Sequence, residues 1–597
     1  MGSGNNRESI AEMNLVAFLK KVDEAVNTKN HEQLSEFIHE IARTYPEESR
    51  EAFLCKLDVF TDAATDESDS MKKPDSGLAQ DHLHDILEKM DEIDTGQRIL
   101  EEEYNDEYDD WYNTDVEEIL YRDTNQICEI IISAAETAHR FFDIEDYENA
   151  ESIYRRLLLL DIQTDGQYTG ETLSISDLEQ MGMVCVDMKA FAVEAIVSAY
   201  FVNPKGERPE AIYELMNLLQ DHAPTLENML QGSLVELPET GEFISAFIDY
   251  LGDKEGRLAE KLILEAVSLE NDREKALTAA RLYAAVHPCL YKRILYENGS
   301  GQDTHKFCGI GLDALKNIPE SYIIRSEIAL KTADYALEIG DEEGAHSCWT
   351  EAFRSDTTAV NYLRICLENP NYQELRKTLR KIYRSFMGKD QPCYHSYDKA
   401  ETAKNSPDRN MTAALLFFDG QFEECIRTAM NSQASLGWSA TFMKQGMALF
   451  LLYLHEGNDY QAGCRNMCQR AVNAISFTSE KYSKGLNRKE DIEDTVLFSE
   501  CFTGWKSVMP MEEYLQKELI GKISIWIRKR VEGIMNGNHR NYYGECAAFI
   551  AAFGEVLESR GEAGAKARCL EEVRAMYSRR RAFHEELRHF GMKAVRK

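Results

Sequence analysis

Few residues in this sequence combine a reactive type with the spacing that chemistry requires, and the first candidate is a glycine motif. Residues 309–314 read GIGLDA, a form of loop whose glycines let the backbone approach a dinucleotide pyrophosphate. Such a loop follows a strand, whereas residues 297–302 read ENGSGQ and predict a loop. We therefore interpret 309–314 as the beginning of a helix and expect no nucleotide cofactor.

Metal ligands are the second candidate chemistry. Cys464 and Cys468 lie four residues apart on a predicted helix, and Cys393 and His395 lie close together in a predicted loop. A structural zinc site needs four converging ligands, which usually come as two closely spaced pairs. Neither pair has a recognisable second pair, so we interpret them as buried thiols and a surface histidine and expect no metal.

Signatures of hydrolytic enzymes are also missing from the sequence. It contains no G-x-S-x-G elbow, no G-x-x-x-x-G-K-[ST] phosphate loop and no Q-A-C-x-G nucleophile site. An active site would have to be assembled in space from residues far apart in the chain. We therefore predict no catalytic residues and a protein that is not an enzyme.

An acidic stretch rich in aromatic residues spans 101–112 and reads EEEYNDEYDDWY. One interpretation is a solvated segment that its like charges keep extended. The other is a docking patch, in which Tyr104, Tyr108, Trp111 and Tyr112 supply contact area and the carboxylates attract a basic partner. The second interpretation makes these four residues candidates for partner binding.

The charge reverses at the other end of the sequence. Residues 560–597 hold 11 Lys and Arg against 5 Glu, a balance of +6, which leaves −43 for the rest of a chain whose net charge is −37. Arg579, Arg580 and Arg581 stand together on a predicted amphipathic helix that also carries Phe583 and Leu587. This helix either caps the body of the protein or binds nucleic acid or an acidic protein through its arginines.

The elements that would position these residues are helices arranged in pairs. Between 134 and 161 a first predicted helix carries small or apolar residues on one face, a turn follows at 143–146, and a second helix repeats the pattern. The positions of this skeleton are Ala134, Ala138, Phe141, Ala150, Tyr154 and Leu157. Small residues let two helices approach, and large ones fill the groove between neighbouring pairs, as in a tetratricopeptide-type hairpin.

The same skeleton returns at irregular spacing in 262–288, 327–353 and 411–430. One hairpin cannot bury its apolar face alone, so several neighbours must stack. We therefore predict an all-α fold, an α-solenoid of irregular tetratricopeptide-like helical hairpins. The predicted regions are an N-terminal helical region with the acidic and aromatic segment (1–125), a helical-repeat region (126–300) and a second one that ends in a basic capping helix (301–597).

Several segments resemble the helical region of bacterial SWIM zinc-finger proteins. They are a hairpin at Leu34 to Leu57, the acidic stretch that ends at Trp111, DYENAESIYRRLLLL at 146–160, AIVSAYFVNPKGERPEAIYELM at 195–216 and YSRRRAFHEELRHFG at 577–591. The resemblance covers most of the chain and implies a helical platform for protein interaction. The metal motif of that family requires Cys-x-Cys, and this sequence has none. Its zinc ligands, and the nucleic-acid role of its finger, are therefore not expected here.

Composition narrows the class of protein further. The chain of 597 residues is 43% hydrophobic and 29% charged, which is enough apolar content for a packed core, and only 12 prolines interrupt its helices. A net charge of −37 disfavours non-specific binding to nucleic acid over most of the surface and favours basic partners.

The cysteines and the apolar runs of the sequence indicate the cellular compartment. The 14 cysteines are scattered singly, which is typical of free thiols in a reducing compartment. The beginning, MGSGNNRESI, lacks a secretory signal, and the longest apolar runs, such as 448–454, are far shorter than the roughly 20 residues of a membrane helix. We expect a soluble cytoplasmic protein that does not contact the membrane.

These observations together predict a non-enzymatic scaffold or adaptor that binds a protein or peptide partner in a groove between helical repeats, because stacked repeats create extended surfaces. The alternative is a protein associated with nucleic acid or acting in regulation, either through the basic helix at the C-terminal end or through an acidic surface that mimics nucleic-acid charge. The sequence does not determine the oligomeric state.

Overall fold

The structure of the chain is a computed structural model, and it describes residues 76–104, 119–231, 235–296, 303–387, 402–430, 441–488 and 492–592. Helices dominate these ranges, and β1 and β2 are the only named strands in them, so the predicted all-α class is confirmed. The chain divides into two compact units, Met1–Asp272 (unit 1) and Arg273–Lys597 (unit 2). The three predicted regions are a different division, and they stay a prediction.

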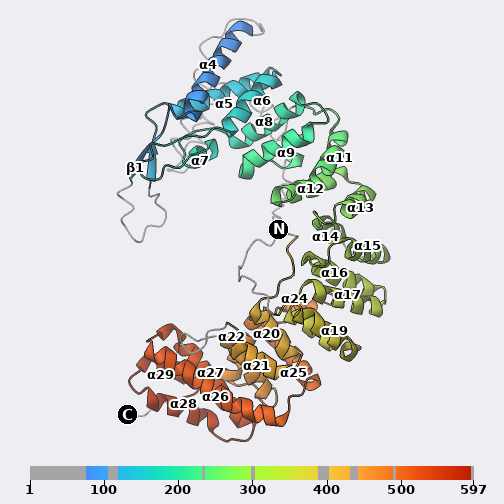
Figure 1. Ribbon diagram of the computed structural model, residues 1–597, viewed down its shortest axis with the longest axis vertical. Coiled ribbons are helices and arrows are strands. Elements are labelled where there is room, and N and C mark those ends of the chain that lie inside the picture. The colour runs from blue at the N-terminus through green and yellow to red at the C-terminus, as the bar shows by residue number, and fades with distance from the viewer. Residues whose placement is uncertain are drawn as a thin grey trace, which may run out of the picture. The chain divides into compact units, whose positions relative to one another are not determined.

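The described part of unit 1 starts with one long helix and a strand pair, and helices follow to the end of the unit. Its described elements are α4 (Ser76–Asp94), β1 (Glu101–Tyr104), β2 (Ile119–Arg122), α5 (Ile127–Asp143), α6 (Tyr147–Leu158), α7 (Ile175–Gln180), α8 (Met188–Val202), α9 (Arg208–Leu219), η4 (Gln220–His222), α10 (Leu226–Gln231), α11 (Thr240–Leu251) and α12 (Arg257–Glu270). Helices α5, α6, α8 and α9 lie side by side, each packed on the next (Figure 1).

Helices α5 and α6 form the hairpin that the sequence predicts at 134–161. The six skeleton side chains are all buried, because the small ones lie where the helices approach and the large ones fill the space beside them. Helix α6 begins at Asp146, whose carboxylate accepts a hydrogen bond from the backbone N–H of Asn149. This cap satisfies one of the backbone donors that a helix start leaves free.

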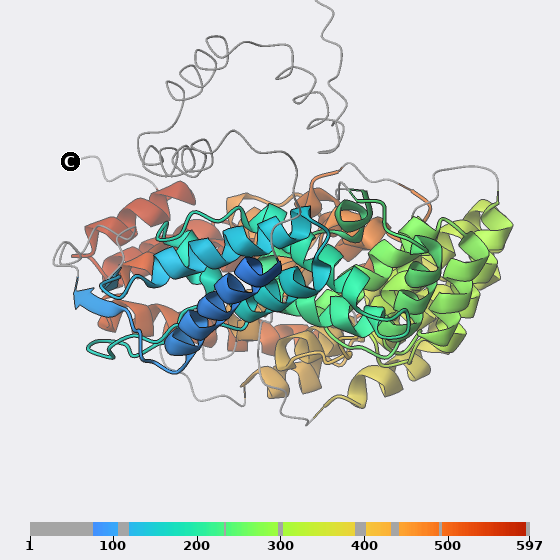
Figure 2. The same ribbon diagram turned by 90° about the horizontal axis from the view of Figure 1, so that it is seen from above.

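The strands β1 and β2 pair in antiparallel register, with Glu101 opposite Arg122 and Tyr104 opposite Ile119. Figure 2 shows a strand of this pair as an arrow at the margin of unit 1. The first four residues of the acidic stretch are therefore a strand, whereas the sequence patterns used above predicted only helices and connecting segments.

Unit 2 is longer and is entirely helical in its described part. Its elements are α13 (Arg273–Leu282), α14 (Cys289–Tyr296), α15 (Thr304–Asn317), α16 (Ile324–Glu338), α17 (Glu342–Ser355), α18 (Ala359–Glu368), α19 (Tyr372–Arg384), α20 (Arg409–Phe418), α21 (Phe422–Met430), α22 (Thr441–Leu454), α23 (Ala462–Ala474), α24 (Ser479–Ser483), α25 (Asp494–Val508), α26 (Glu513–Asn536), η6 (Arg540–Tyr542), α27 (Tyr543–Ser559), α28 (Ala565–Met576) and α29 (Arg581–His589).

Two of the predicted hairpins lie in unit 2. Helices α16 and α17 correspond to 327–353, and α20 and α21 correspond to 411–430. Both turns contain a glycine in the left-handed region, Gly340 at φ 78° and Gly420 at φ 69°. The remaining copy, 262–288, is divided, because α12 ends unit 1 and α13 begins unit 2.

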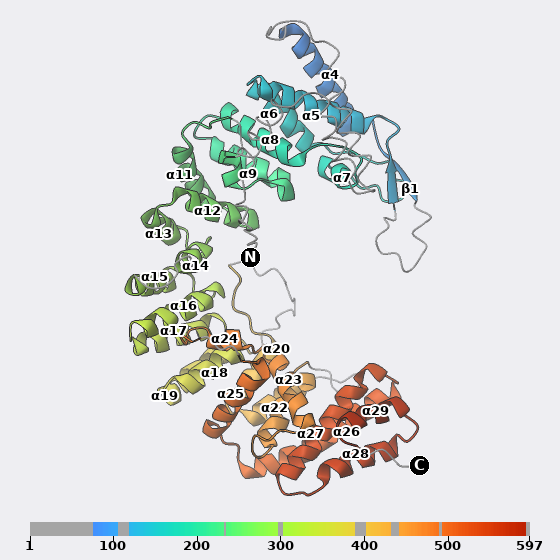
Figure 3. The ribbon, with the colours of Figure 1, turned by 180° about the vertical axis from the view of Figure 1, so that it is seen from behind.

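Packing in unit 2 changes along the chain. Helices α14 to α17 pack mainly on their sequence neighbours, as stacked hairpins do. Later helices also pack on distant ones: α18 contacts α24 and α25, and α23 contacts α27. Figure 3 shows α27 among α26, α28 and α29. Stacking is thus present within each unit, whereas a solenoid that continues through the whole chain stays a prediction.

Two further findings concern membrane-spanning helices and the thiols. Within the described ranges, none of the helices combines the length and the apolar character needed to cross a membrane. Every cysteine in the same ranges is a free thiol.

Candidate functional site

The four aromatic residues predicted to bind a partner are only partly placed by the structure. Tyr104 ends β1 with 36% of its surface exposed, and its ring centroid lies 6.0 Å from that of Tyr168. Tyr108, Trp111 and Tyr112 lie outside the described residues. The docking patch at 101–112 therefore stays a prediction.

Glu102, on the same strand, is buried and holds a loop of unit 1 in place. Its Oε1 accepts hydrogen bonds from the hydroxyls of Thr164 and Thr169, both at 2.7 Å, and its Oε2 accepts one from the backbone N–H of Thr169 at 2.8 Å. Burial alone would raise the pKa of this carboxyl, but these donors, with the N–H of Tyr168, lower it to about 2. Glu102 is therefore a structural anion and is not available to a partner.

The three consecutive arginines near the C-terminal end have different surroundings. Arg580 donates from Nη2 to the carbonyl oxygen of Met535 at 2.9 Å and from Nη1 to Oδ1 of Asn538 at 2.5 Å, which caps the end of α26. Arg579 and Arg581 are exposed. Helix α29 buries Phe583 and packs against α27, as a capping helix requires.

The two candidate chemical motifs are parts of packed helices. Residues 309–314 lie inside α15, not at its beginning, and a Cβ on Gly311 would come within 2.0 Å of Oγ1 of Thr332, so this glycine serves the contact between α15 and α16. Cys464 and Cys468 are buried in α23, and burial raises the pKa of the Cys468 thiol to about 12. Cys393 and His395 lie outside the described residues, and no metal-ligating group of three or more His, Cys, Asp or Glu is found in the part that the structure describes.

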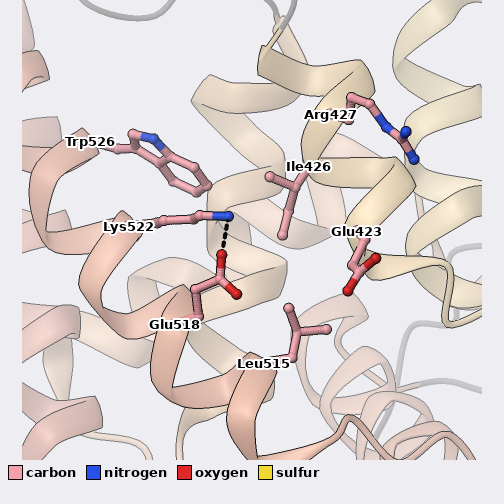
Figure 4. A pocket seen from close by; sticks show the side chains of 7 residues that line it. All are labelled: Glu423, Ile426, Arg427, Leu515, Glu518, Lys522 and Trp526. Carbon is pink, nitrogen blue, oxygen red and sulfur yellow. Dashed lines mark ion pairs between the residues drawn. The ribbon is translucent and has the colours of Figure 1, made fainter.

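A groove between α21 and α26 is the candidate functional site. It is a cavity of about 480 Å³. Figure 4 shows its lining side chains, which come from both helices: Glu423, Ile426, Arg427, Leu515, Glu518, Lys522 and Trp526. Ile426, Leu515 and Trp526 are each only 8% exposed and give the groove an apolar floor. The four charged residues form its rim.

A buried carboxylate fixes the beginning of α21. Asp419 lies in the turn before this helix with its side chain fully buried, and it accepts hydrogen bonds from Nε of Arg376 at 2.7 Å and from Nε of Arg380 at 2.5 Å. The hydroxyl of Tyr383 donates to Oδ2 of Asp419 at 2.8 Å. All three donors belong to α19, so this network joins α19 to the α20–α21 hairpin and orients one wall of the groove.

The other wall, α26, is held by its own buried face and by an ion pair. Leu519 and Ile523 are fully buried on the side that faces the core. Arg530 is 1% exposed, and its Nε donates to Oε1 of Glu545 at 2.8 Å, which joins α26 to α27. A hydrogen bond of 3.3 Å from the hydroxyl of Tyr514 to Oε1 of Glu423 joins α26 to α21 directly. The groove is thus formed by two well-supported helices.

The groove offers an apolar surface with a charged rim. Its lining contains no serine, cysteine or histidine, and its only amine, that of Lys522, is paired with Glu518 at 2.6 Å. A partly apolar cavity of this size is typical of ligand sites, and a tryptophan beside aliphatic side chains is typical of the energetic centre of a protein interface.

Sequence reasoning identified the hairpin that contains α21 but not the groove. One available signal was the helical spacing of Leu515, Glu518, Lys522 and Trp526, which places two charges and two apolar residues on one face of α26. The meeting of this face with Ile426, 89 residues earlier in the chain, follows from tertiary packing alone.

Comparison of the sequence with protein-family models and with curated proteins finds no match to either. The resemblance to the helical region of SWIM zinc-finger proteins accordingly stays a prediction.

Proposed function

We propose that this protein is a non-enzymatic scaffold or adaptor that binds a segment of another protein in the groove between α21 and α26. One observation carries the proposal: Ile426, Leu515 and Trp526 meet at the floor of a cavity whose rim is charged. An apolar side chain of a partner would displace water from this floor, and burying such a side chain contributes roughly 1.5–3 kcal/mol. The charged rim would orient the partner and select among sequences.

The same proposal places the protein in the cytoplasm. Support comes from the free thiols of the described cysteines, because a reducing compartment keeps cysteines unpaired.

Selection from a displayed library of random peptides on the full-length chain tests this function. We expect enriched peptides that the wild-type chain binds and that two groove variants do not. Trp526→Ala removes part of the floor. Glu518→Trp fills the groove from its rim, and because Glu518 is exposed this variant keeps the core intact.

The matched control is Ile144→Ala, which removes an apolar side chain that is 53% exposed in unit 1, far from the groove in sequence. Circular dichroism and thermal unfolding establish that each variant is folded. Equal enrichment on the wild type and on folded Glu518→Trp would contradict the proposed site, and so would the absence of any enriched peptide.

A second candidate function is association with nucleic acid through the C-terminal helix. The observation that favours it is the exposure of Arg579, Arg581 and Arg588, none of which has an ion pair with a described residue. Phosphate contacts make binding fall steeply with salt. Affinity for a labelled oligonucleotide, measured against salt concentration for the wild type and for Arg579→Gln with Arg581→Gln, tests this role. An affinity that does not depend on salt or on the two arginines would exclude it.

A further inference from the structure

We infer that the groove between α21 and α26 selects an acidic peptide segment, one that presents an apolar side chain to Trp526 and carboxylates to Arg427 and Lys529. This inference rests on the proposed function and names the class of ligand for the same groove. It differs from the sequence-based expectation of a basic partner, which rests on the net charge of −37 and on the acidic stretch at 101–112.

The carboxylates on the rim already have partners within the protein. Glu518 forms an ion pair with Lys522 at 2.6 Å, on the same helix and one turn away (Figure 4). Glu423 accepts the hydrogen bond from the hydroxyl of Tyr514. A basic ligand would have to compete with these contacts, which weakens the attraction that either carboxylate could offer.

Two cations, Arg427 on the rim and Lys529 one turn beyond Trp526 on α26, have no such partner. Arg427 belongs to the rim, is exposed, and forms no ion pair or hydrogen bond with any residue that the structure describes. Lys529 is exposed as well, and it too has no ion pair within the described ranges. Lys529 follows Trp526 by three residues on α26, so the two side chains are neighbours on one helix face.

The arrangement of these groups gives the groove a direction. Along α26 the order is Leu515, Glu518, Lys522, Trp526 and then Lys529, and along α21 Glu423 precedes Arg427. Figure 4 shows Arg427 toward the same end of the groove as Trp526, and Glu423 toward the end where Leu515 lies. Arg427 therefore lies toward the Trp526 end of the groove, and Lys529 follows Trp526 on α26, whereas Glu423 and Glu518 lie toward the Leu515 end.

The wider charge distribution is compatible with an acidic ligand at this place. Unit 1 contains 21 Lys and Arg against 62 Asp and Glu, a balance of −41, whereas unit 2 contains 46 against 42, a balance of +4. The Debye length at physiological salt is about 8 Å, so the local cations of the groove dominate what a bound segment experiences.

A peptide fits these features better than a nucleic acid does. An apolar floor of isoleucine, leucine and tryptophan buries a hydrophobic side chain, while a phosphate backbone needs a row of cations. Arg427 on the rim and Lys529 beyond Trp526 offer two cations, which match one or two carboxylates placed about one helical turn from an apolar residue.

The experiment measures the composition of the peptides that the full-length chain selects from the random library. We expect peptides that combine Asp or Glu with aliphatic or aromatic residues. The best of them should lose affinity when Asn and Gln replace its Asp and Glu. It should also bind about tenfold more weakly, a loss of about 1.4 kcal/mol, to the double variant Arg427→Gln with Lys529→Gln, measured by fluorescence polarisation, because the peptide carboxylates lose both cations.

The matched control is Lys377→Gln with Lys381→Gln on α19, which removes two exposed cations that have no ion pair with a described residue and do not line the groove. This control should bind the peptide like the wild type. Two results would overturn this inference and leave the proposed function standing. In the first, Glu518→Trp abolishes binding of the selected peptides, but these peptides carry no acidic residues. In the second, the peptides bind the Arg427 and Lys529 double variant as tightly as the wild type.

Two other outcomes would overturn more. If Glu518→Trp binds every selected peptide as the wild type does, both the inference and the proposed function fail. If labelled oligothymidine binds the wild type, loses affinity on Glu518→Trp and displaces the selected peptide, the groove is a nucleic-acid site and the inference is wrong.

Discussion

Glu102 in unit 1 and Asp419 in unit 2 are both buried carboxylates, but the two units surround them with different donors. Glu102 is held by hydroxyls and backbone N–H groups, all of them neutral. Asp419 is held by two guanidinium groups and by the phenols of Tyr362 and Tyr383. A third buried carboxylate, Glu555 in unit 2, again pairs with a cation, Lys566, at 2.7 Å.

The difference corresponds to the charge that each unit carries. Unit 1, at −41, has few cations, and Glu102, its buried carboxylate within the described ranges, depends on neutral dipoles. Unit 2, at +4, neutralises its buried anions internally and still keeps Arg427 and Lys529 free of ion pairs within the described ranges. The comparison supports the proposal that the groove of unit 2 recognises an acidic segment, and the acidic balance of unit 1 favours the prediction of a basic partner there.

The largest effect is expected from Asp419→Asn, which breaks the ion-pair arrangement of unit 2. It leaves Arg376 and Arg380 facing a neutral amide, and removing one partner of a buried ion pair costs about 3–5 kcal/mol. Urea unfolding should show a lower midpoint for unit 2, with the transition of unit 1 unchanged. The control is Glu480→Gln, which removes an exposed ion pair with Lys484 and should leave the midpoint as it is. Equal midpoints for the two variants would show that the Asp419 network does not stabilise unit 2.

The next effect tests the neutral donors of unit 1. Glu102→Gln removes the negative charge of a carboxylate that accepts five hydrogen bonds. We expect it to lower the free energy of unfolding by about 3 kcal/mol, the upper end for hydrogen bonds to a charged group. Because the folded-state pKa is lowered from 4.5 to about 2, this stabilisation is complete above pH 4.5 and is lost as the pH falls toward 2. Between pH 4.5 and 2, the stability of the wild type should therefore fall more steeply with decreasing pH than that of Glu102→Gln, as measured by acid unfolding. Parallel curves for the two proteins would contradict the assignment.

A third prediction concerns how closely helices approach in each unit. A Cβ on Gly463 in α23 would come within 2.5 Å of the backbone nitrogen of Ala552, and backbone in α27 cannot easily move, so Gly463→Ala should cost about 1–3 kcal/mol. Gly241 in α11 of unit 1 has nothing within 4 Å of its Cβ position, so Gly241→Ala should be neutral or slightly stabilising. Thermal unfolding of the two variants measures the difference, and destabilisation by both would show that unit 1 is packed as closely at this point.

The smallest effect is a dependence of the thermal stability of unit 1 on pH near neutrality. His139 lies 2.9 Å from Oε2 of Glu194, and this hydrogen bond raises the pKa of the imidazole. A raised pKa stabilises the fold below the unfolded-state value of about 6.5, and the contribution disappears as the pH rises through the folded-state pKa. His139→Gln should remove this slope from the thermal midpoint of unit 1. An unchanged slope would mean that another group titrates there.

The paired helices were predictable because they depend on local spacing. Alanines at helical intervals identified α5 with α6 and α16 with α17, since close helix approach requires small residues wherever the chain forms such a hairpin. The strand pair at 101–104 and 119–122 was not predicted, because each strand has only four residues and the first is rich in glutamate, so neither carries a periodic apolar pattern. The groove was also not predicted, because its two walls come from separate parts of unit 2.

The sequence by itself determined the helical class, the hairpin as building unit and the separation of an acidic body from a basic end. These properties follow from composition and from intervals of a few residues. Tertiary structure alone decided that Ile426 meets Trp526, that Arg580 caps α26 while its two neighbours stay exposed, and that two arginines converge on Asp419. Such contacts depend on how distant helices pack, and the energy of each becomes favourable only after the rest of the unit has folded around it.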